Sequence, residues 1–221
     1  IEKACDNILE GTHDDQFVTP AIQGGAGTSM NMNVNEVVAA LASERMGVEI
    51  HPNDHVNRSQ STNDVNPTAL KITLLQLLPD LTQALDELAT LFEAKAHTYR
   101  SLRKLARTHL QDALPIYAGD ELAAYSAVIS RGNDKMKEYK KYLHEVNLGG
   151  TAVGNGISAS RTYQEAVYEH LNALTGLDVR PAANLMSQTS SQTDFVHLSM
   201  LIKLLFIDLS KIATDLRVLS S

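Results

Sequence analysis

The sequence contains a single cysteine, no tryptophan and few aromatic residues, and its acidic side chains outnumber its basic ones. Because Cys5 has no second cysteine to pair with, an intramolecular disulfide is excluded. This cysteine usage fits a reducing compartment, so we expect a cytoplasmic protein. The formal net charge of −7 argues against a nucleic-acid partner, which normally requires a basic surface. The most apolar run, residues 198–209, is short and contains Lys203 and Asp208, so we expect no membrane span.

The composition that is present is typical of a globular protein. The 221 residues are 43% hydrophobic and 20% charged, which predicts an ordered fold with a buried core. The chain starts without methionine, in residues typical of a helix interior, and it stops directly after an apolar helical pattern. We therefore expect a piece of a longer protein.

Three long segments, residues 70–100, 118–146 and 195–219, carry helical periodicity. Their apolar residues alternate spacings of four and three, which predicts one apolar seam per helix and shallow packing against a partner helix. The seams consist of Leu70, Leu74, Leu77, Leu81, Ala84, Leu88 and Leu91; of Ala118, Leu122, Tyr125, Ile129, Gly132, Met136, Tyr139, Leu143 and Val146; and of Phe195, Leu198, Ile202, Leu205, Leu209, Ile212, Leu216 and Leu219.

These seams predict an all-α bundle of long helices, in which Gly132 permits close approach of a neighbouring helix. Additional apolar neighbours widen the seams, so a monomeric bundle and a bundle completed by other chains both fit the pattern. No segment of useful length shows the alternation of a strand, and we expect none.

A glycine-rich segment at residues 23–33 precedes a helical pattern. Glycines let backbone amides turn inward, the hydroxyls of Thr28 and Ser29 add donors, and a helix N-terminus favours an anion. The lysine of a phosphate-binding P-loop is missing. An anion site and a purely structural turn are both open.

A second polar segment, residues 51–68, reads His-Pro-Asn-Asp-His and then Ser-Gln-Ser-Thr-Asn-Asp. Its histidine spacing fits no common zinc motif, so we favour no metal. Ser61, Thr62 and Asn63 offer neutral donors that suit a small dicarboxylate. The same residues are typical of a helix N-cap, and both roles are compatible.

Two further polar segments follow, residues 107–115 and 147–160. The first places Thr108 beside His109, and a histidine can orient or relay a proton near neutral pH. A structural histidine is the alternative, since no serine nucleophile elbow or cysteine partner accompanies it.

Taken in order, these segments resemble the aspartase/fumarase superfamily. The resemblance is carried by QGGAGTSMNMNVNEV, HPNDHVNRSQSTNDVNPTA, RTHLQDA, NLGGTAVGNG and KIATDLRVLSS, and it extends over residues 1–221. It implies a long-helix bundle whose core is completed in a homotetramer with active sites shared between subunits, without a cofactor. It also implies that residues 1–68 end an N-terminal helical domain, and that residues 69–221 form a central bundle truncated at its C-terminus.

The resemblance implies an anti elimination that releases fumarate through an aci-carboxylate intermediate, which hydroxyls and amides stabilise. Ala26, Ser29 and the Ser-Thr-Asn at 61–63 resemble the aspartase branch, which removes ammonia from L-aspartate. His51 before Pro-Asn-Asp resembles fumarases, which hydrate fumarate. Ammonia elimination is the favoured function, with fumarate hydration and a non-catalytic helical scaffold as alternatives.

The superfamily motifs imply a role for each matching residue. The catalytic positions are Thr108 and His109. The substrate-binding positions are Thr28, Ser29, Ser61, Thr62 and Asn63. The positions of an accessory dicarboxylate site are His51, Asn53 and Asp54. The superfamily's mobile serine loop, which supplies the base, has no counterpart in the 221 residues, so we expect this chain alone to be inactive.

Overall fold

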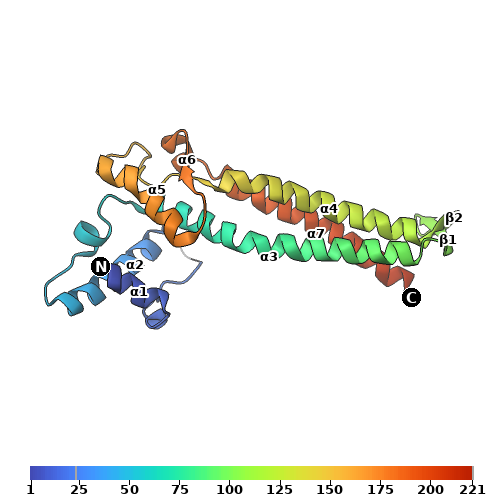
Figure 1. Cartoon of the computed structure of the whole chain (residues 1–221), viewed down its shortest axis with the longest axis horizontal. Helices are drawn as coiled ribbons and strands as arrows, with labels where there is room; N and C mark the ends of the chain where they lie inside the picture. Colours follow the sequence, from blue (N-terminus) through green and yellow to red (C-terminus); the bar gives the residue numbers. More distant parts are fainter. Residues whose placement is uncertain (23, 221) are drawn as a thin grey trace. The chain divides into compact units, whose positions relative to one another are not determined.

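The computed structural model describes residues 1–22 and 24–220, so Gln23 of the glycine-rich segment and Ser221 lie outside the described residues. Most of the regular structure is helical, as expected from the sequence (Figure 1). The chain forms two compact units. Unit 1 comprises Ile1–Thr73 and His144–Ser191, and unit 2 comprises Leu74–Leu143 and Gln192–Ser221. The division into domains at residues 68 and 69 stays a prediction.

Unit 1 is built from short helices and the first turns of a long one. Its helices are α1 (Glu2–Leu9), α2 (Thr28–Met46), the beginning of α3 (Thr62–Thr98), α5 (Arg161–Thr175) and α6 (Leu185–Ser190), with a 3₁₀ turn η1 (Asp14–Gln16) and a π-helical turn η2 (Pro52–Val56). The two-residue strands β3 (Glu145–Val146) and β4 (Arg180–Pro181) pair in parallel. Ala4, Val38 and Ala42 form a small core between α1 and α2.

Unit 2 is a bundle of three long helices. It contains the remainder of α3, α4 (Ala118–Leu143) and α7 (Thr193–Leu219), and α4 and α7 run side by side along α3 (Figure 1). Its core consists of Leu85, Ala89, Tyr125, Ile129, Met136, Leu205 and Ile212. Buried polar side chains add directional bonds, because Ser126 Oγ donates to the Ala89 carbonyl at 2.8 Å and Asn133 Nδ2 donates to the Thr82 carbonyl at 2.8 Å.

The three long helices confirm the periodicity, but the seam predicted for the first of them is wrong in part. Leu81 and Leu88 pack against the core of unit 2 as predicted, whereas three other members of the seam are exposed. Leu70, Leu77 and Leu91 are 48%, 60% and 62% exposed. The buried face of α3 lies one residue further along the chain, at Leu75, Leu78 and Leu85. One residue turns a helix by about 100°. The apolar stripe of α3 is wider than one seam, and the packing of α4 and α7 selects which part of it is buried.

The close approach predicted at Gly132 is confirmed. A Cβ atom at Gly132 in α4 would lie 3.1 Å from Leu205 Cδ1 in α7, which is tighter than ordinary van der Waals contact. The seams of α4 and α7 are also confirmed at their centres, since Ile129, Met136 and Leu205 are at most 2% exposed.

The expectation that the chain contains no strands is wrong, because an antiparallel hairpin connects α3 to α4. It consists of β1 (Arg103–Thr108) and β2 (Gln111–Tyr117), with Thr108 opposite Gln111. Every residue of both strands is exposed or half-buried, so the hairpin has no buried face to impose a period of two. Pro115 in β2 further masks the strand pattern.

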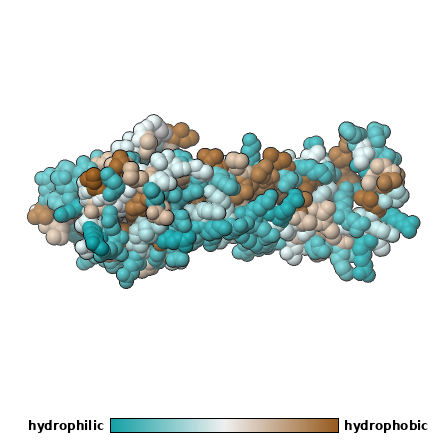
Figure 2. Space-filling model, turned by 90° about the horizontal axis from the view of Figure 1, so that it is seen from above, coloured by the Kyte–Doolittle hydropathy of each residue, from teal (hydrophilic) through white to brown (hydrophobic). Residues whose placement is uncertain are grey.

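Large apolar side chains remain exposed along the bundle of unit 2, where Figure 2 shows brown apolar surface among teal hydrophilic surface. On α3 and α7, those between 54% and 62% exposed are Leu77, Leu91, Val196, Met200, Leu204, Phe206 and Ile207. Soluble monomers rarely expose this much apolar surface in one region. Within residues 1–22 and 24–220, none of the helices is both long enough and apolar enough to cross a membrane.

Candidate functional site

Unit 1 contains a cavity of about 550 Å³ that is lined by four segments of the chain. These are the start of α2, the turn η2 with the residues after it, the start of α3, and the loop 151–158. The lining side chains are Thr28, Met32, Asn53, Asn57, Gln60, Ser61, Thr62, Thr151, Ala152, Val153, Asn155, Ile157 and Ser158. All of these described residues are neutral, and most carry a hydroxyl or an amide.

The glycine-rich segment places Thr28 at this cavity. Gly27 directly precedes α2 with a φ of 83°, a conformation that glycine adopts without steric cost. A Cβ atom at Gly27 would lie 2.0 Å from Asn66 Nδ2, and that same amide donates to the Gly27 carbonyl at 2.9 Å. The turn is therefore structural, and it also places the first residue of α2 against the cavity. The anion site stays a prediction.

The start of α3 is a reciprocal cap, as the sequence predicted. Ser61 Oγ accepts the Asn63 N–H at 3.3 Å, and the Asp64 carboxylate accepts the Ser61 N–H at 2.9 Å. Because α3 begins at Thr62, the capping hydroxyl belongs to Ser61. The Thr62 hydroxyl is not used for capping and accepts a hydrogen bond of 3.2 Å from Asn31 Nδ2.

Asp64 joins the start of α3 to the opposite wall of the cavity. Its carboxylate is fully buried and accepts the N–H groups of Gly149 and Thr151 at 3.1 and 2.8 Å. Burial raises the pKa of Asp64, while the hydrogen bonds from the N–H groups of Ser61, Thr151 and Gly149 act to lower that pKa. Next to it, Asn63 Nδ2 donates to the Ala152 carbonyl at 2.7 Å. These bonds hold the loop 151–158 beside Ser61 and Thr62.

The structure brings four of the predicted site residues to the cavity, namely Thr28, Asn53, Ser61 and Thr62. The other residues predicted in this region, Ser29, His51, Asp54 and Asn63, are not among the described residues that line it. Asn63 holds the Ala152 backbone as described above, and Ser29 is an exposed residue in the first turn of α2.

His51 forms a local cap at the turn η2. Its Nδ1 accepts the N–H groups of Asn53 and Asp54 at 3.3 and 3.2 Å and lies 3.4 Å from Asp54 Oδ2. These bonds shape the segment from which Asn53 reaches the cavity. The accessory dicarboxylate site stays a prediction.

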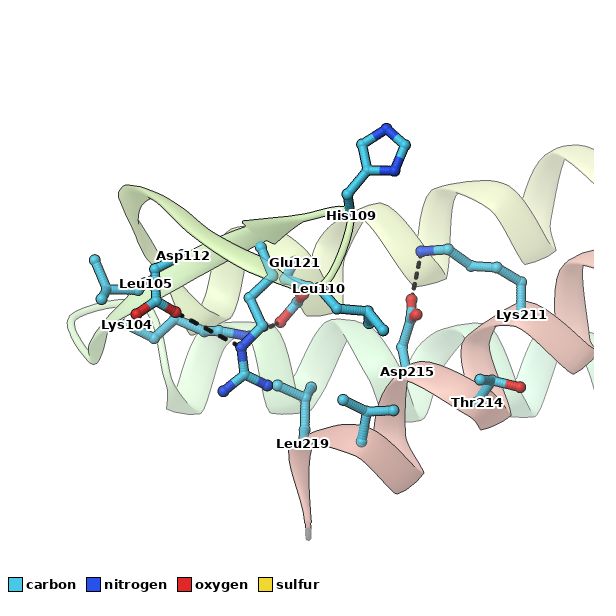
Figure 3. Close-up of a pocket in the computed structure, with 12 residues that line it drawn as sticks. Lys104, Leu105, His109, Leu110, Asp112, Glu121, Lys211, Thr214, Asp215 and Leu219 are labelled. Atoms are coloured by element: carbon cyan, nitrogen blue, oxygen red, sulfur yellow. Dashed lines mark hydrogen bonds and ion pairs between the residues drawn. The ribbon is translucent and has the colours of Figure 1, made fainter.

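Thr108 and His109 belong to unit 2, at the tip of the β1–β2 hairpin. His109 and Leu110 form its two-residue turn, with φ values of 51° and 61°. Two-residue turns with positive φ normally use glycine, asparagine or aspartate, so the backbone at His109 and Leu110 is strained. The residue types at this turn therefore do not predict a hairpin. His109 and Leu110 line a cavity of about 720 Å³, and the His109 ring projects away from the ion pairs around it (Figure 3).

Three ion pairs surround this second cavity. They are Lys104 with Glu121, Arg107 with Asp112, and Lys211 with Asp215 (Figure 3). Opposite charges are balanced within each pair, so the charged groups near His109 are already partnered. Among the described residues, no group of three or more histidine, cysteine, aspartate or glutamate side chains is arranged to hold a metal ion.

Sequence reasoning missed several side chains of the cavity in unit 1, including Asn57, Gln60, Thr151 and Ser158. Two of these are marked by backbone strain, since Thr151 and Ser158 have φ values of 58° and 75°. A threonine in this region of φ is a rare conformation and tends to persist only where surrounding contacts enforce it. Backbone strain of this kind cannot be read from the residue types.

The long helices make this an α-helical protein with a neutral, hydroxyl-rich cavity, and a family model described as Lyase matches residues 1–221. The chain belongs to this family. Among its relatives, the aspartate ammonia-lyase of Bacillus subtilis (strain 168) is 44% identical over 227 residues, covering 100% of this chain and 48% of the relative. The aspartate ammonia-lyase of Helicobacter pylori (strain ATCC 700392 / 26695) is 42% identical over 224 residues, covering 99% of this chain and 48% of the relative.

Solved structures agree with this assignment. A fumarate lyase:delta crystallin from Brucella melitensis, crystallised with cobalt, matches with a TM-score of 0.92 and 43% identity, covering 99% of this chain and 49% of the other. A class II fumarase from Schistosoma mansoni matches with a TM-score of 0.89 and 33% identity, covering 99% of this chain and 50% of the other. The chain thus spans about half the length of the relatives that it matches.

Proposed function

We propose that the protein is an aspartate ammonia-lyase, which reversibly eliminates ammonia from L-aspartate to give fumarate. The observation that carries this proposal is the cavity of unit 1, whose described lining is neutral and rich in hydroxyl and amide groups. Such groups can surround carboxylate oxygens with hydrogen bonds without a buried cation. The identity of 42–44% to aspartate ammonia-lyases over essentially the whole chain supports the choice of substrate.

In this proposal, Thr28, Ser61 and Thr62 hold the carboxylate beside the carbon that loses its proton. A base removes that proton, and the electron pair enters the carboxylate as an aci-carboxylate. The pair then forms the carbon–carbon double bond while the carbon–nitrogen bond breaks and ammonia leaves. Donors that are already in place stabilise the intermediate because they need no reorganisation when the charge develops.

The remaining predicted residues have supporting roles in this mechanism. Ser29 lies next to Thr28 in the chain, and Asn63, Thr108 and His109 act near the leaving group and the second carboxylate. The serine loop implied by the superfamily resemblance has no counterpart in the 221 residues, so we propose that this chain by itself does not turn over substrate.

We further propose that the protein is a cytoplasmic homotetramer whose active sites are shared between subunits. The exposed apolar side chains of α3 and α7 support association, because burial of such surface is favourable.

Fumarate hydration is the second candidate function. It is supported by similarity to the class II fumarate hydratase of Saccharolobus solfataricus. That relative is 38% identical over 222 residues, and the match covers 50% of its length. The chemistry differs only in the leaving group, because water would leave from L-malate where ammonia leaves from L-aspartate.

The test uses protein expressed from the complete gene, incubated separately with L-aspartate and with L-malate while fumarate absorbance is followed. Formation of fumarate from L-aspartate supports the proposal. Formation from L-malate alone would establish the hydratase instead. A folded, tetrameric protein that is silent with both substrates would favour the non-catalytic scaffold.

A further inference from the structure

We infer that Asn31 is a positioning residue that turns the hydroxyl proton of Thr62 into the cavity, where it donates to a substrate carboxylate. The inference rests on the proposed function and adds a residue outside the set predicted from the sequence. Asn31 lies in α2, one turn after Thr28, and is only 5% exposed.

The contacts of Asn31 use both hydrogens of its side-chain amide. Nδ2 lies 3.2 Å from Thr62 Oγ1 and 3.4 Å from Asn57 Oδ1. An amide nitrogen donates and does not accept, so Thr62 Oγ1 is the acceptor in this pair. Both acceptors line the cavity of unit 1.

A threonine hydroxyl has one proton to donate and two lone pairs that accept. Because one lone pair of Thr62 Oγ1 faces the Asn31 amide, the proton of that hydroxyl cannot point toward Asn31. It is left to donate elsewhere, and Thr62 faces the cavity. A hydroxyl that accepts a hydrogen bond also becomes a better donor, since neighbouring hydrogen bonds polarise one another.

The adjacent hydroxyl, that of Ser61, also accepts a hydrogen bond from the protein. Ser61 Oγ accepts the Asn63 N–H at 3.3 Å, which leaves the Ser61 proton free to donate as well. Two neighbouring hydroxyls that both accept from the protein present two protons to the cavity. This polarity suits an anion and opposes a ligand that can only donate.

The chain offers a matched control at Asn35, one turn further along α2. Asn35 is also 5% exposed, but its Nδ2 contacts Met32 Sδ at 3.9 Å and, within the described part of the chain, no hydroxyl of the cavity. Replacing Asn35 therefore removes an equally buried amide without changing the hydrogen bonding of Thr62.

The test is a double-mutant cycle in the protein expressed from the complete gene, with L-aspartate as substrate. Asn31→Leu is expected to lower kcat/KM by about 10-fold, and by less than about 2-fold when Thr62→Ala is already present, because the hydroxyl that Asn31 orients is gone. Asn35→Leu is expected to change kcat/KM by less than about 2-fold in both backgrounds. Circular dichroism and the melting temperature monitor folding.

Asn31→Asp serves as a second variant of nearly unchanged shape. Its carboxylate only accepts, so it would draw the Thr62 proton away from the cavity, and the loss should again depend on the presence of Thr62. The added charge acts in both backgrounds and cancels in the cycle. Equal losses with and without the Thr62 hydroxyl would overturn this inference alone. Absence of turnover in the unmodified protein would overturn the proposed function and this inference with it.

Discussion

The carboxylate of Asp64 accepts the backbone N–H of Thr151 at 2.8 Å, across 87 residues of sequence. It also accepts the N–H groups of Ser61 and Gly149, so one buried side chain satisfies three backbone donors. In Asp64→Asn, one carboxylate oxygen becomes an NH₂ group that faces a donor. We expect the free energy of unfolding to fall by about 2–4 kcal/mol, measured by urea denaturation, because a buried N–H loses its acceptor.

Asp80→Asn is the matched control for this prediction, since Asp80 is an exposed residue of the same helix. It makes the same chemical change without affecting a buried donor, and its free energy of unfolding should stay within about 0.5 kcal/mol of the unmodified protein. Equal stability of the two variants would show that the loop 151–158 does not depend on Asp64.

Thr62→Ala tests the carboxylate-binding hydroxyl directly. In the protein expressed from the complete gene, we expect kcat/KM for L-aspartate to fall by about 10-fold or more, which corresponds to about 1.4 kcal/mol of transition-state binding. Thr62→Ser retains the hydroxyl and should keep most of the activity. The N-cap contact made by Ser61 is kept in both variants, whereas only Thr62→Ala removes an acceptor of the buried Asn31 amide, so urea denaturation is run alongside the kinetics. An unchanged kcat/KM in Thr62→Ala would remove Thr62 from the substrate site.

The bundle was predictable because a long apolar periodicity predicts a helix whichever neighbours that helix packs against. The sequence reveals that α3, α4 and α7 are helices, but it does not reveal which part of the wide apolar stripe of α3 packs against the other helices. In the structure, Leu77 is exposed while Leu78 is buried. The hairpin was not predictable, because its strands have no buried face and its turn uses His109 and Leu110 in a conformation that favours other residues.

The lining of the cavity in unit 1 was predictable where chemistry and local structure coincide in one motif. Ser61 and Thr62 belong to a segment that both caps a helix and lines the cavity. Thr151 was missed because it reaches the cavity only through the long-range bond to Asp64. Asn31 was missed because Asn31 and Asn35 are both buried asparagines on the same face of α2, and neither residue type nor periodicity distinguishes the one that reaches Thr62.

Gly27→Ala tests the glycine turn before α2. The new Cβ atom would be strained at a φ of 83° and would displace the Asn66 amide, which holds the Gly27 carbonyl. We expect a loss of stability of about 1–3 kcal/mol and a raised KM for L-aspartate, because Thr28 follows directly. Gly24→Ala is the control, since nothing lies within 4 Å of its Cβ position. If the two variants behave alike, the turn does not position Thr28.

Tyr139→Phe tests a pH dependence of unit 2. Burial, together with the nearby Asp194 carboxylate, raises the pKa of Tyr139 from 10.0 to about 12. The unfolded chain therefore releases this proton at a lower pH than the folded chain does, and the stability contributed by Tyr139 is present below about pH 10 and lost between about pH 10 and 12. Phenylalanine lacks this proton but also lacks the 3.3 Å hydrogen bonds that the hydroxyl donates to Asp194.

We therefore expect Tyr139→Phe to be less stable than the unmodified protein at about pH 8, with the difference narrowing at about pH 11 as the unfolded phenol ionises. Urea denaturation at both pH values measures this difference. Tyr99→Phe, which alters an exposed tyrosine of the same unit, is expected to follow the unmodified protein at both values. A constant difference between Tyr139→Phe and the unmodified protein would mean that Tyr139 ionises alike in the folded and unfolded chains, so that Asp194 and burial do not hold its proton.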